Sequence, residues 1–139
     1  MKIAIRYYTR SGNTEKLAQA IGEALNLTAE KIEKPLEEKV DILFLGCSYY
    51  AFDMDNEVKQ FLAQNKENIG KVVCFGTSAM MKSMAKPMKK VTDALGIAVS
   101  GEEFHCRGAF GPANKGRPNA EDIHAAKAFA LDLMKKKNA

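Results

Sequence analysis

The stretch with the clearest chemistry is a polar loop between an apolar run and a helical pattern. It holds the hydroxyl groups of Thr9, Ser11 and Thr14, together with Gly12 and Asn13. Backbone N–H groups at the start of a helix have no partner within it, and the helix dipole favours an anion there. Gly12 lets the backbone approach a ligand closely, and Asn13 can either cap the helix or donate to the ligand. These residue types predict a phosphate site, although ordinary loops use the same residues.

Two later segments carry groups suited to a flat ligand. After the apolar run VDILFLG come Tyr49, Tyr50 and Phe52, whose rings can stack on a planar molecule. After a second run, VVCFG, come Thr77 and Ser78, which offer backbone donors. A phosphate clamp combined with a stacking platform indicates a phosphorylated, flat molecule.

The spacing of apolar residues predicts the elements that position these loops. Strands are expected over residues 2–8, 28–32, 40–46, 72–76 and 97–106. Helices are expected over residues 14–25, 57–64, 81–95 and 120–137. Pro87 predicts a break or a start within the third helix, because proline removes a hydrogen bond from a helix interior. Ser100-Gly101 is expected to interrupt the last strand.

The alternation of strands with helices predicts an α/β fold. The apolar run over residues 40–46 is nearly continuous, which is typical of a central parallel strand covered on both faces. Right-handed crossovers then place helices on both faces of a doubly wound parallel sheet. Such sheets bind ligands at the carboxyl ends of their strands, where the three loops are expected to meet.

Length and composition narrow the class of protein. The chain has 139 residues and a net charge of +4, with 46% hydrophobic residues, which predicts a single globular domain over residues 1–139. No apolar run is long enough to span a membrane, and no basic stripe carries interleaved aromatic residues. We therefore expect a cytoplasmic protein that binds neither membranes nor nucleic acid.

The remaining reactive side chains favour packing roles. Cys47, Cys74 and Cys106 are widely spaced, odd in number and next to apolar runs, so they are expected to be reduced core residues. His105 and His124 lie far apart and predict no joint site.

Other classes that share this fold lack their required residues. A receiver domain needs an aspartate at the end of the third strand, where this chain has Gly46 and Cys47. A low-molecular-weight tyrosine phosphatase needs a cysteine in the first loop, and none occurs in residues 1–46. The P-loop pattern G-x-x-x-x-G-K-[ST] is absent as well.

The first loop also resembles a known family. The sequence Thr9-Arg10-Ser11-Gly12-Asn13-Thr14 is similar to the phosphate loop of flavodoxins, T/S-x-T/S-G-N-T. The resemblance covers essentially the whole chain. It implies a flavodoxin-like, five-stranded parallel sheet in the order 2-1-3-4-5, with FMN as the cofactor and its phosphate inside this loop.

The resemblance implies further contacts with FMN in the other two loops. In flavodoxins the loop after the third strand supplies an aromatic ring that stacks on the isoalloxazine; Tyr50 is favoured here, and Tyr49 remains an alternative. The whole set of cofactor-binding residues implied beyond the first loop is Ser48, Tyr49, Tyr50, Ala51, Phe52, Gly76, Thr77 and Ser78.

The chain also departs from the family pattern. Flavodoxins are typically acidic, whereas this chain is basic. Arg10 stands inside the phosphate loop, where it could add a cation to the phosphate or point to solvent. The stretch Ala51-Phe52-Asp53 lacks the glycine whose peptide, in the family, turns to bond the flavin N5.

The function implied by the resemblance is low-potential electron transfer between redox partner proteins, by a monomer or weak dimer. The alternative is an NAD(P)H-dependent FMN oxidoreductase that acts on quinones or similar acceptors. A carrier is favoured over a turnover enzyme.

Overall fold

The structure is a computed structural model that describes residues 1–50, 53–78, 83, 85–109 and 114–138. The side chains of residues 48–50, 53 and 138 lie outside the described part. The strands are β1 (Ile3–Tyr7), β2 (Ala29–Lys31), β3 (Val40–Tyr50), β4 (Asp53–Met54), β5 (Ile69–Ser78) and β6 (Ala98–Arg107). The helices are α1 (Asn13–Leu25), α2 (Asn56–Asn65), α3 (Ala85–Leu95) and α4 (Ala120–Asn138), with a 3₁₀ turn, η1, at Lys66–Asn68.

The strand order confirms the predicted topology. The main path of the sheet runs β2-β1-β3-β5-β6 with every pair parallel, which is the order 2-1-3-4-5 of the five expected strands. The short strand β4 is an addition that the sequence did not suggest. It pairs antiparallel with the end of β3, where Tyr49 lies opposite Met54 and Tyr50 opposite Asp53.

Two strands run further than their apolar residues predicted. We expected β3 to end at Gly46 and β5 to end at Gly76, but they continue to Tyr50 and Ser78. The backbone explains the difference, because Ser48 pairs with Thr77 in the parallel ladder. Main-chain hydrogen bonds extend a strand whatever its side chains are, so hydrophobicity alone underestimates its length.

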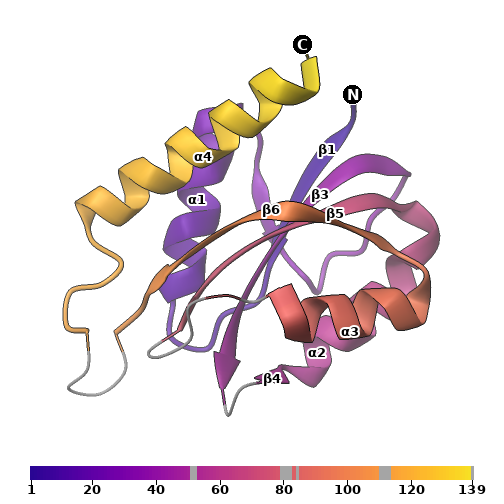
Figure 1. Cartoon of the computed structure of the whole chain (residues 1–139), viewed down its shortest axis with the longest axis horizontal. Helices are drawn as coiled ribbons and strands as arrows, with labels where there is room; N and C mark the ends of the chain where they lie inside the picture. The colour runs from indigo at the N-terminus through magenta and orange to yellow at the C-terminus, as the bar shows by residue number, and fades with distance from the viewer. Residues whose placement is uncertain (51–52, 79–82, 84, 110–113, 139) are drawn as a thin grey trace.

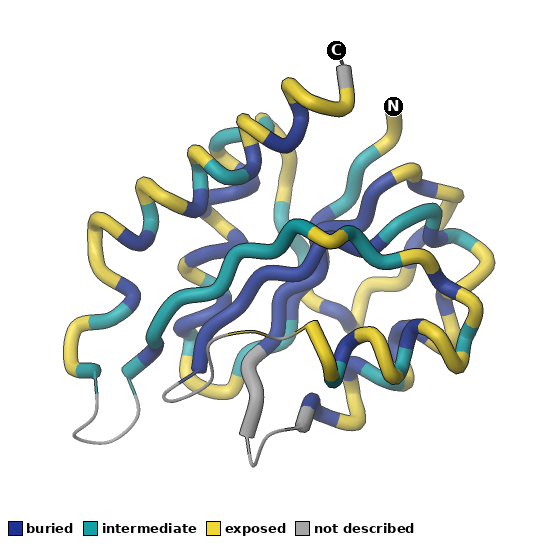
Figure 2. Tube along the Cα trace, viewed as in Figure 1, coloured by how far each residue is buried: buried dark blue, intermediate teal, exposed yellow. Residues whose placement is uncertain are grey.

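Each face of the sheet is covered by a pair of helices (Figure 1). Helices α1 and α4 pack on one face, and α2 and α3 pack on the other. Alternate residues of β3 enter the two cores: Phe44 joins the cluster under α1 and α4, while Leu43 and Leu45 join the cluster over α2 and α3. Burial on both faces explains the continuous apolar run, and Figure 2 shows the central strands as the most buried part of the trace.

The expected irregularities are found where the sequence placed them. Helix α3 begins at Ala85, so Pro87 lies in its first turn, where proline is tolerated. Strand β6 is irregular next to Ser100 and Gly101, since Val72 pairs with Val99 but Cys74 pairs with Glu103. The strand nevertheless continues beyond this point.

Candidate functional site

The segments singled out in the sequence meet at one edge of the sheet. Strands β1, β3, β5 and β6 are parallel, so their carboxyl ends lie together, at the lower left of Figure 1. Residues 8–12 follow β1, the pair Gly108 and Ala109 follows β6, and Thr77 and Ser78 end β5. We expected these two residues in the loop after the strand, but they belong to β5 itself and are buried.

The loop after β1 has the geometry of an anion site. Gly12 has a φ of +88° and forms the N-cap of α1 without giving it a side-chain hydrogen bond. The first N–H groups of α1 have no partner within the helix and point along its axis toward this loop. Thr9 Oγ1 accepts a hydrogen bond of 2.9 Å from the Gly12 N–H and closes the loop on itself. The conformation of the loop is therefore stabilised by its own internal hydrogen bond.

Thr14 lies at the base of this loop and not on its surface. Its side chain is fully buried, and its Oγ1 is 3.5 Å from Thr77 Oγ1 at the end of β5. Gly46 leaves room for the Thr14 side chain. A Cβ at residue 46 would overlap the ring of Phe75 and lie 2.9 Å from Thr14 Cγ2. The two threonine hydroxyls thus join the start of α1 to the end of β5.

Asn13 has a role that the sequence analysis did not anticipate. We expected it to cap α1 or to donate to a ligand, but it is the first helical residue, and its Nδ2 donates to the Ala109 carbonyl at 3.0 Å. Gly108 permits this approach, since a Cβ there would lie 3.0 Å from Asn13 Nδ2 and 2.9 Å from Thr77 Cβ. The segment after β6 is therefore part of the site.

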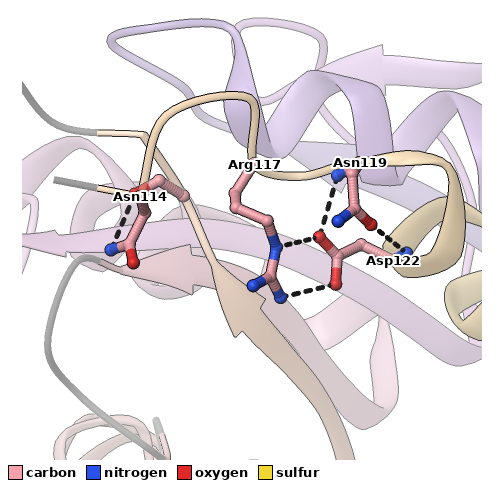
Figure 3. Close-up of polar contacts among 5 residues, drawn as sticks. Asn114, Arg117, Asn119 and Asp122 are labelled. Carbon is pink, nitrogen blue, oxygen red and sulfur yellow. Dashed lines mark hydrogen bonds and ion pairs between the residues drawn. The ribbon is translucent and has the colours of Figure 1, made fainter. Parts of the chain in front are cut away.

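A network of hydrogen bonds anchors that segment to α4 (Figure 3). The Ala109 N–H donates to the Arg117 carbonyl at 2.9 Å. The Arg117 guanidinium donates two hydrogen bonds to Asp122, from Nε at 2.6 Å and from Nη2 at 2.8 Å. Asp122 and Asn119 cap α4 reciprocally, each accepting a backbone N–H from the other. The Arg117 hydrogen bond lowers the pKa of Asp122.

Sequence reasoning missed Gly108, Ala109 and the network behind them. The only available signal was a glycine directly after the last strand, and a glycine in a loop rich in glycine and proline is not distinctive. Close approach to Asn13 becomes visible only when segments 96 residues apart are placed together.

Arg10 makes a contact that the sequence analysis did not consider. Its guanidinium forms an ion pair with Asp55, the N-cap residue of α2, through Nη2 and Oδ1. This hydrogen bond raises the pKa of Arg10. The loop after β1 is therefore tied to the start of α2.

The aromatic part of the site remains a prediction. Ser48, Tyr49 and Tyr50 belong to β3 by their backbone, and the hairpin to β4 follows them. Ala51 and Phe52, and the side chains of the other three, lie outside the described residues. The backbone does place Ser48 beside Thr77 and Cys47 beside Gly76 at the same edge of the sheet.

Cys47 and Cys74 are buried as the sequence predicted, whereas Cys106 is only partly buried. None of the three cysteines forms a disulfide, and burial raises the pKa of the Cys74 and Cys106 thiols to about 12, so both stay protonated at neutral pH. His105 is half-buried, and burial lowers its pKa. Its Nε2 has no hydrogen-bond partner within the described part of the chain. No group of three or more metal-ligating side chains occurs in the residues that the structure describes.

A separate open cavity of about 550 Å³ lies along the flank of β1 and β2. Its lining includes Arg6, whose guanidinium donates to the carbonyls of Ile5, Lys34 and Pro35 at 3.0, 2.9 and 3.4 Å. These hydrogen bonds fix the connection between β2 and β3. The cavity is thus a structural feature away from the carboxyl edge.

Comparison with known proteins gives a consistent family. A family model described as a flavodoxin domain matches residues 4–117. An uncharacterized protein of Methanocaldococcus jannaschii is 30% identical, and the alignment covers 97% of this chain and 99% of that protein. The chain therefore belongs to the flavodoxin domain family.

Solved structures share the fold. A flavodoxin from the domain Archaea matches with a TM-score of 0.76 and 18% identity, covering 100% of both chains. A flavoprotein from Lactobacillus acidophilus, solved in complex with FMN, matches with a TM-score of 0.63 and 19% identity over 76% of this chain and 92% of that one. Among the described residues, no helix has the length and apolar character that a membrane span requires.

Proposed function

We propose that this member of the flavodoxin family binds FMN at the carboxyl edge of its sheet and carries electrons between protein partners at low potential. The observation that carries the proposal is the loop after β1. Its left-handed Gly12 opens the start of α1 to an anion, and its buried Thr14 meets Thr77 beneath it. A helix start of this kind favours a phosphate through its N–H groups and its dipole.

The residue types at this edge support FMN as the ligand, in preference to a simple phosphate. Ser11, Gly12 and the first N–H groups of α1 would hold the phosphate, with Thr9 and Thr14 adding hydroxyls. Segment 48–52 would supply Tyr49 or Tyr50 as the ring that stacks on the flavin. Gly76, Thr77 and Ser78 would line the remaining side of the site. The FMN found in the Lactobacillus acidophilus flavoprotein supports this choice of cofactor.

The protein's contribution is to bind and orient the cofactor. FMN supplies the redox chemistry when bound, because it accepts electrons singly or in pairs. The described residues would hold the phosphate end in place, because the segment 10–14 is joined to three other segments by the Asn13–Ala109, Thr14–Thr77 and Arg10–Asp55 contacts. Electron transfer to another protein then requires only that one edge of the ring stays accessible.

The test is a flavin titration of the purified protein. Wild type is expected to bind FMN more tightly than riboflavin, measured by quenching of flavin fluorescence. Equal affinity for the two ligands would contradict the phosphate site. A protein that binds neither would contradict the proposed function altogether.

A second measurement separates the carrier from the oxidoreductase. The FMN-loaded protein is mixed anaerobically with NADH or NADPH alone, and the visible absorption is followed. A carrier is expected to keep its yellow colour until a reducing partner protein is added. Rapid bleaching by either nucleotide would favour the enzymatic alternative.

A further inference from the structure

The Arg10–Asp55 ion pair joins two segments that are 45 residues apart in the chain. Arg10 is the second residue of the loop 9–14, whereas Asp55 follows β4 and begins α2. The two side chains differ in exposure: 53% of the arginine side chain is accessible and only 4% of the aspartate. The carboxylate is thus a buried anchor, and the arginine reaches to it from the loop.

The second carboxylate oxygen of Asp55 makes no contact that explains its position among the described residues. Asp55 Oδ2 is buried and has no hydrogen-bond partner there, and the side chain gives α2 no capping bond. Helix α2 begins instead with the Val58 and Lys59 N–H groups on the Asp55 carbonyl oxygen. A buried carboxylate is costly unless it is paired, so its position is best explained by Arg10.

We propose that Asp55 is a positioning residue for the phosphate loop and acts through Arg10; this inference rests on the proposed FMN site. The pair holds the middle of the loop 9–14 against the segment that follows the expected aromatic residues. Because Asp55 compensates its charge, Arg10 places the backbone N–H groups of the loop and does not serve as the cation for the phosphate.

The alternative role for Arg10 predicts the opposite effect at Asp55. If the guanidinium bound the phosphate directly, Asp55 would compete for it, and removing the aspartate charge would tighten FMN binding. If the pair positions the loop, either single change loosens it, and the second change then adds nothing. The two variants together therefore distinguish a ligand from a positioning residue.

The experiment compares wild type, Arg10→Gln, Asp55→Asn and the double variant. FMN and riboflavin dissociation constants are measured by fluorescence, and the melting temperature without flavin is recorded. We expect each single variant and the double variant to lose roughly tenfold in FMN affinity. Riboflavin affinity should change by less than about twofold, because riboflavin has no phosphate for the loop to hold.

Two further variants protect the test. Arg10→Lys keeps the charge but not the planar fork of the guanidinium, so it should bind FMN between wild type and Arg10→Gln. If Arg10→Gln does not fold, Arg10→Lys replaces it in the comparison with Asp55→Asn. Glu38→Gln removes an exposed pair with Lys2 far from the loop and should leave both flavin affinities unchanged.

The outcomes separate this inference from its premise. Wild type that binds no flavin overturns both. Wild type that prefers FMN, with Asp55→Asn binding FMN as well as or better than wild type, overturns only the positioning role. Equal losses for FMN and riboflavin also overturn it, because a general loss of structure would explain them.

Discussion

Two arginines four residues apart illustrate two ways of placing a cation. Arg6, on β1, is buried and donates to three backbone carbonyl oxygens. Arg10, in the loop after β1, is half exposed and pairs with the buried carboxylate of Asp55. Burial lowers the pKa of Arg6, while the hydrogen bond that Arg10 donates to Asp55 raises the pKa of Arg10.

The difference lies in what each arginine holds. The acceptors of Arg6 are one carbonyl of β1 and two carbonyls of the connection between β2 and β3, which carries none of the expected ligand contacts. The acceptor of Arg10 is one particular side chain beside the proposed site. We therefore expect changes at Arg6 to affect folding stability alone and changes near Arg10 to affect flavin binding.

The largest effect is expected at Arg6. Replacing Arg6 by Met removes its hydrogen bonds to three carbonyl oxygens, and hydrogen bonds to a charged group contribute about 1.5–3 kcal/mol each, of which the apolar replacement recovers part. We expect the free energy of unfolding to fall by about 3 kcal/mol, measured by urea denaturation. FMN affinity of the folded variant should stay within about twofold of wild type. A large, selective loss of FMN affinity would erase the contrast with Arg10.

The next effect concerns Thr14. Thr14→Ala removes a donor to the phosphate, and losing a hydrogen bond to a charged group costs about 1.5–3 kcal/mol, or roughly 10- to 150-fold in affinity. Riboflavin should be affected far less. The test is to titrate the variant with FMN and with riboflavin. An equal loss of affinity for the two flavins would place Thr14 away from the phosphate.

Two glycines offer a matched pair at opposite edges of the sheet. Gly12 and Gly96 have φ values of +88° and +72°, and a Cβ at either position would meet nothing within 4 Å. Alanine at each should therefore cost about 1 kcal/mol in unfolding free energy through backbone strain alone. Only Gly12→Ala should also weaken FMN. If Gly96→Ala weakened FMN equally, the effect of Gly12→Ala would be one of general stability.

The smallest effect is expected at Asp122. Its pKa is lowered by the Arg117 hydrogen bond, so its stabilising contribution is complete above the ordinary value of 3.8 and is lost as the pH falls below it. Asp122→Asn should lower the unfolding free energy by less than about 1 kcal/mol at pH 7. Denaturation curves at several pH values should show a smaller loss of stability in acid for the variant. An unchanged acid dependence would show that other carboxylates determine it.

Much of the fold could be predicted from the sequence, because its determinants are local. The runs over residues 3–7 and 40–46 are apolar enough to be buried strands. Leu17 and Ile21 lie one helical turn apart and reach the same core. Pro87 marked the start of α3 for a steric reason that depends only on its own ring.

The features of the fold that were predicted wrongly depend on pairing between neighbouring strands. The ends of β3 and β5 are set by main-chain pairing between strands, in which Ser48 and Thr77 are partners. Strand β4 exists only because the chain turns back on Tyr49 and Tyr50. Neither pairing leaves a trace in hydrophobic periodicity.

By itself, the sequence determined the loop after β1: glycine at the one left-handed position and hydroxyls on both sides of it, directly before a helix. Backbone conformation and helix capping are properties of neighbouring residues, so a short stretch suffices to specify them. Only the tertiary structure decided what holds that loop. Arg10 reaches Asp55, Thr14 reaches Thr77 and Asn13 reaches Ala109 across 45, 63 and 96 residues, respectively. Such contacts arise because parallel strands bring all their carboxyl ends to one edge, whatever the distance between them along the chain.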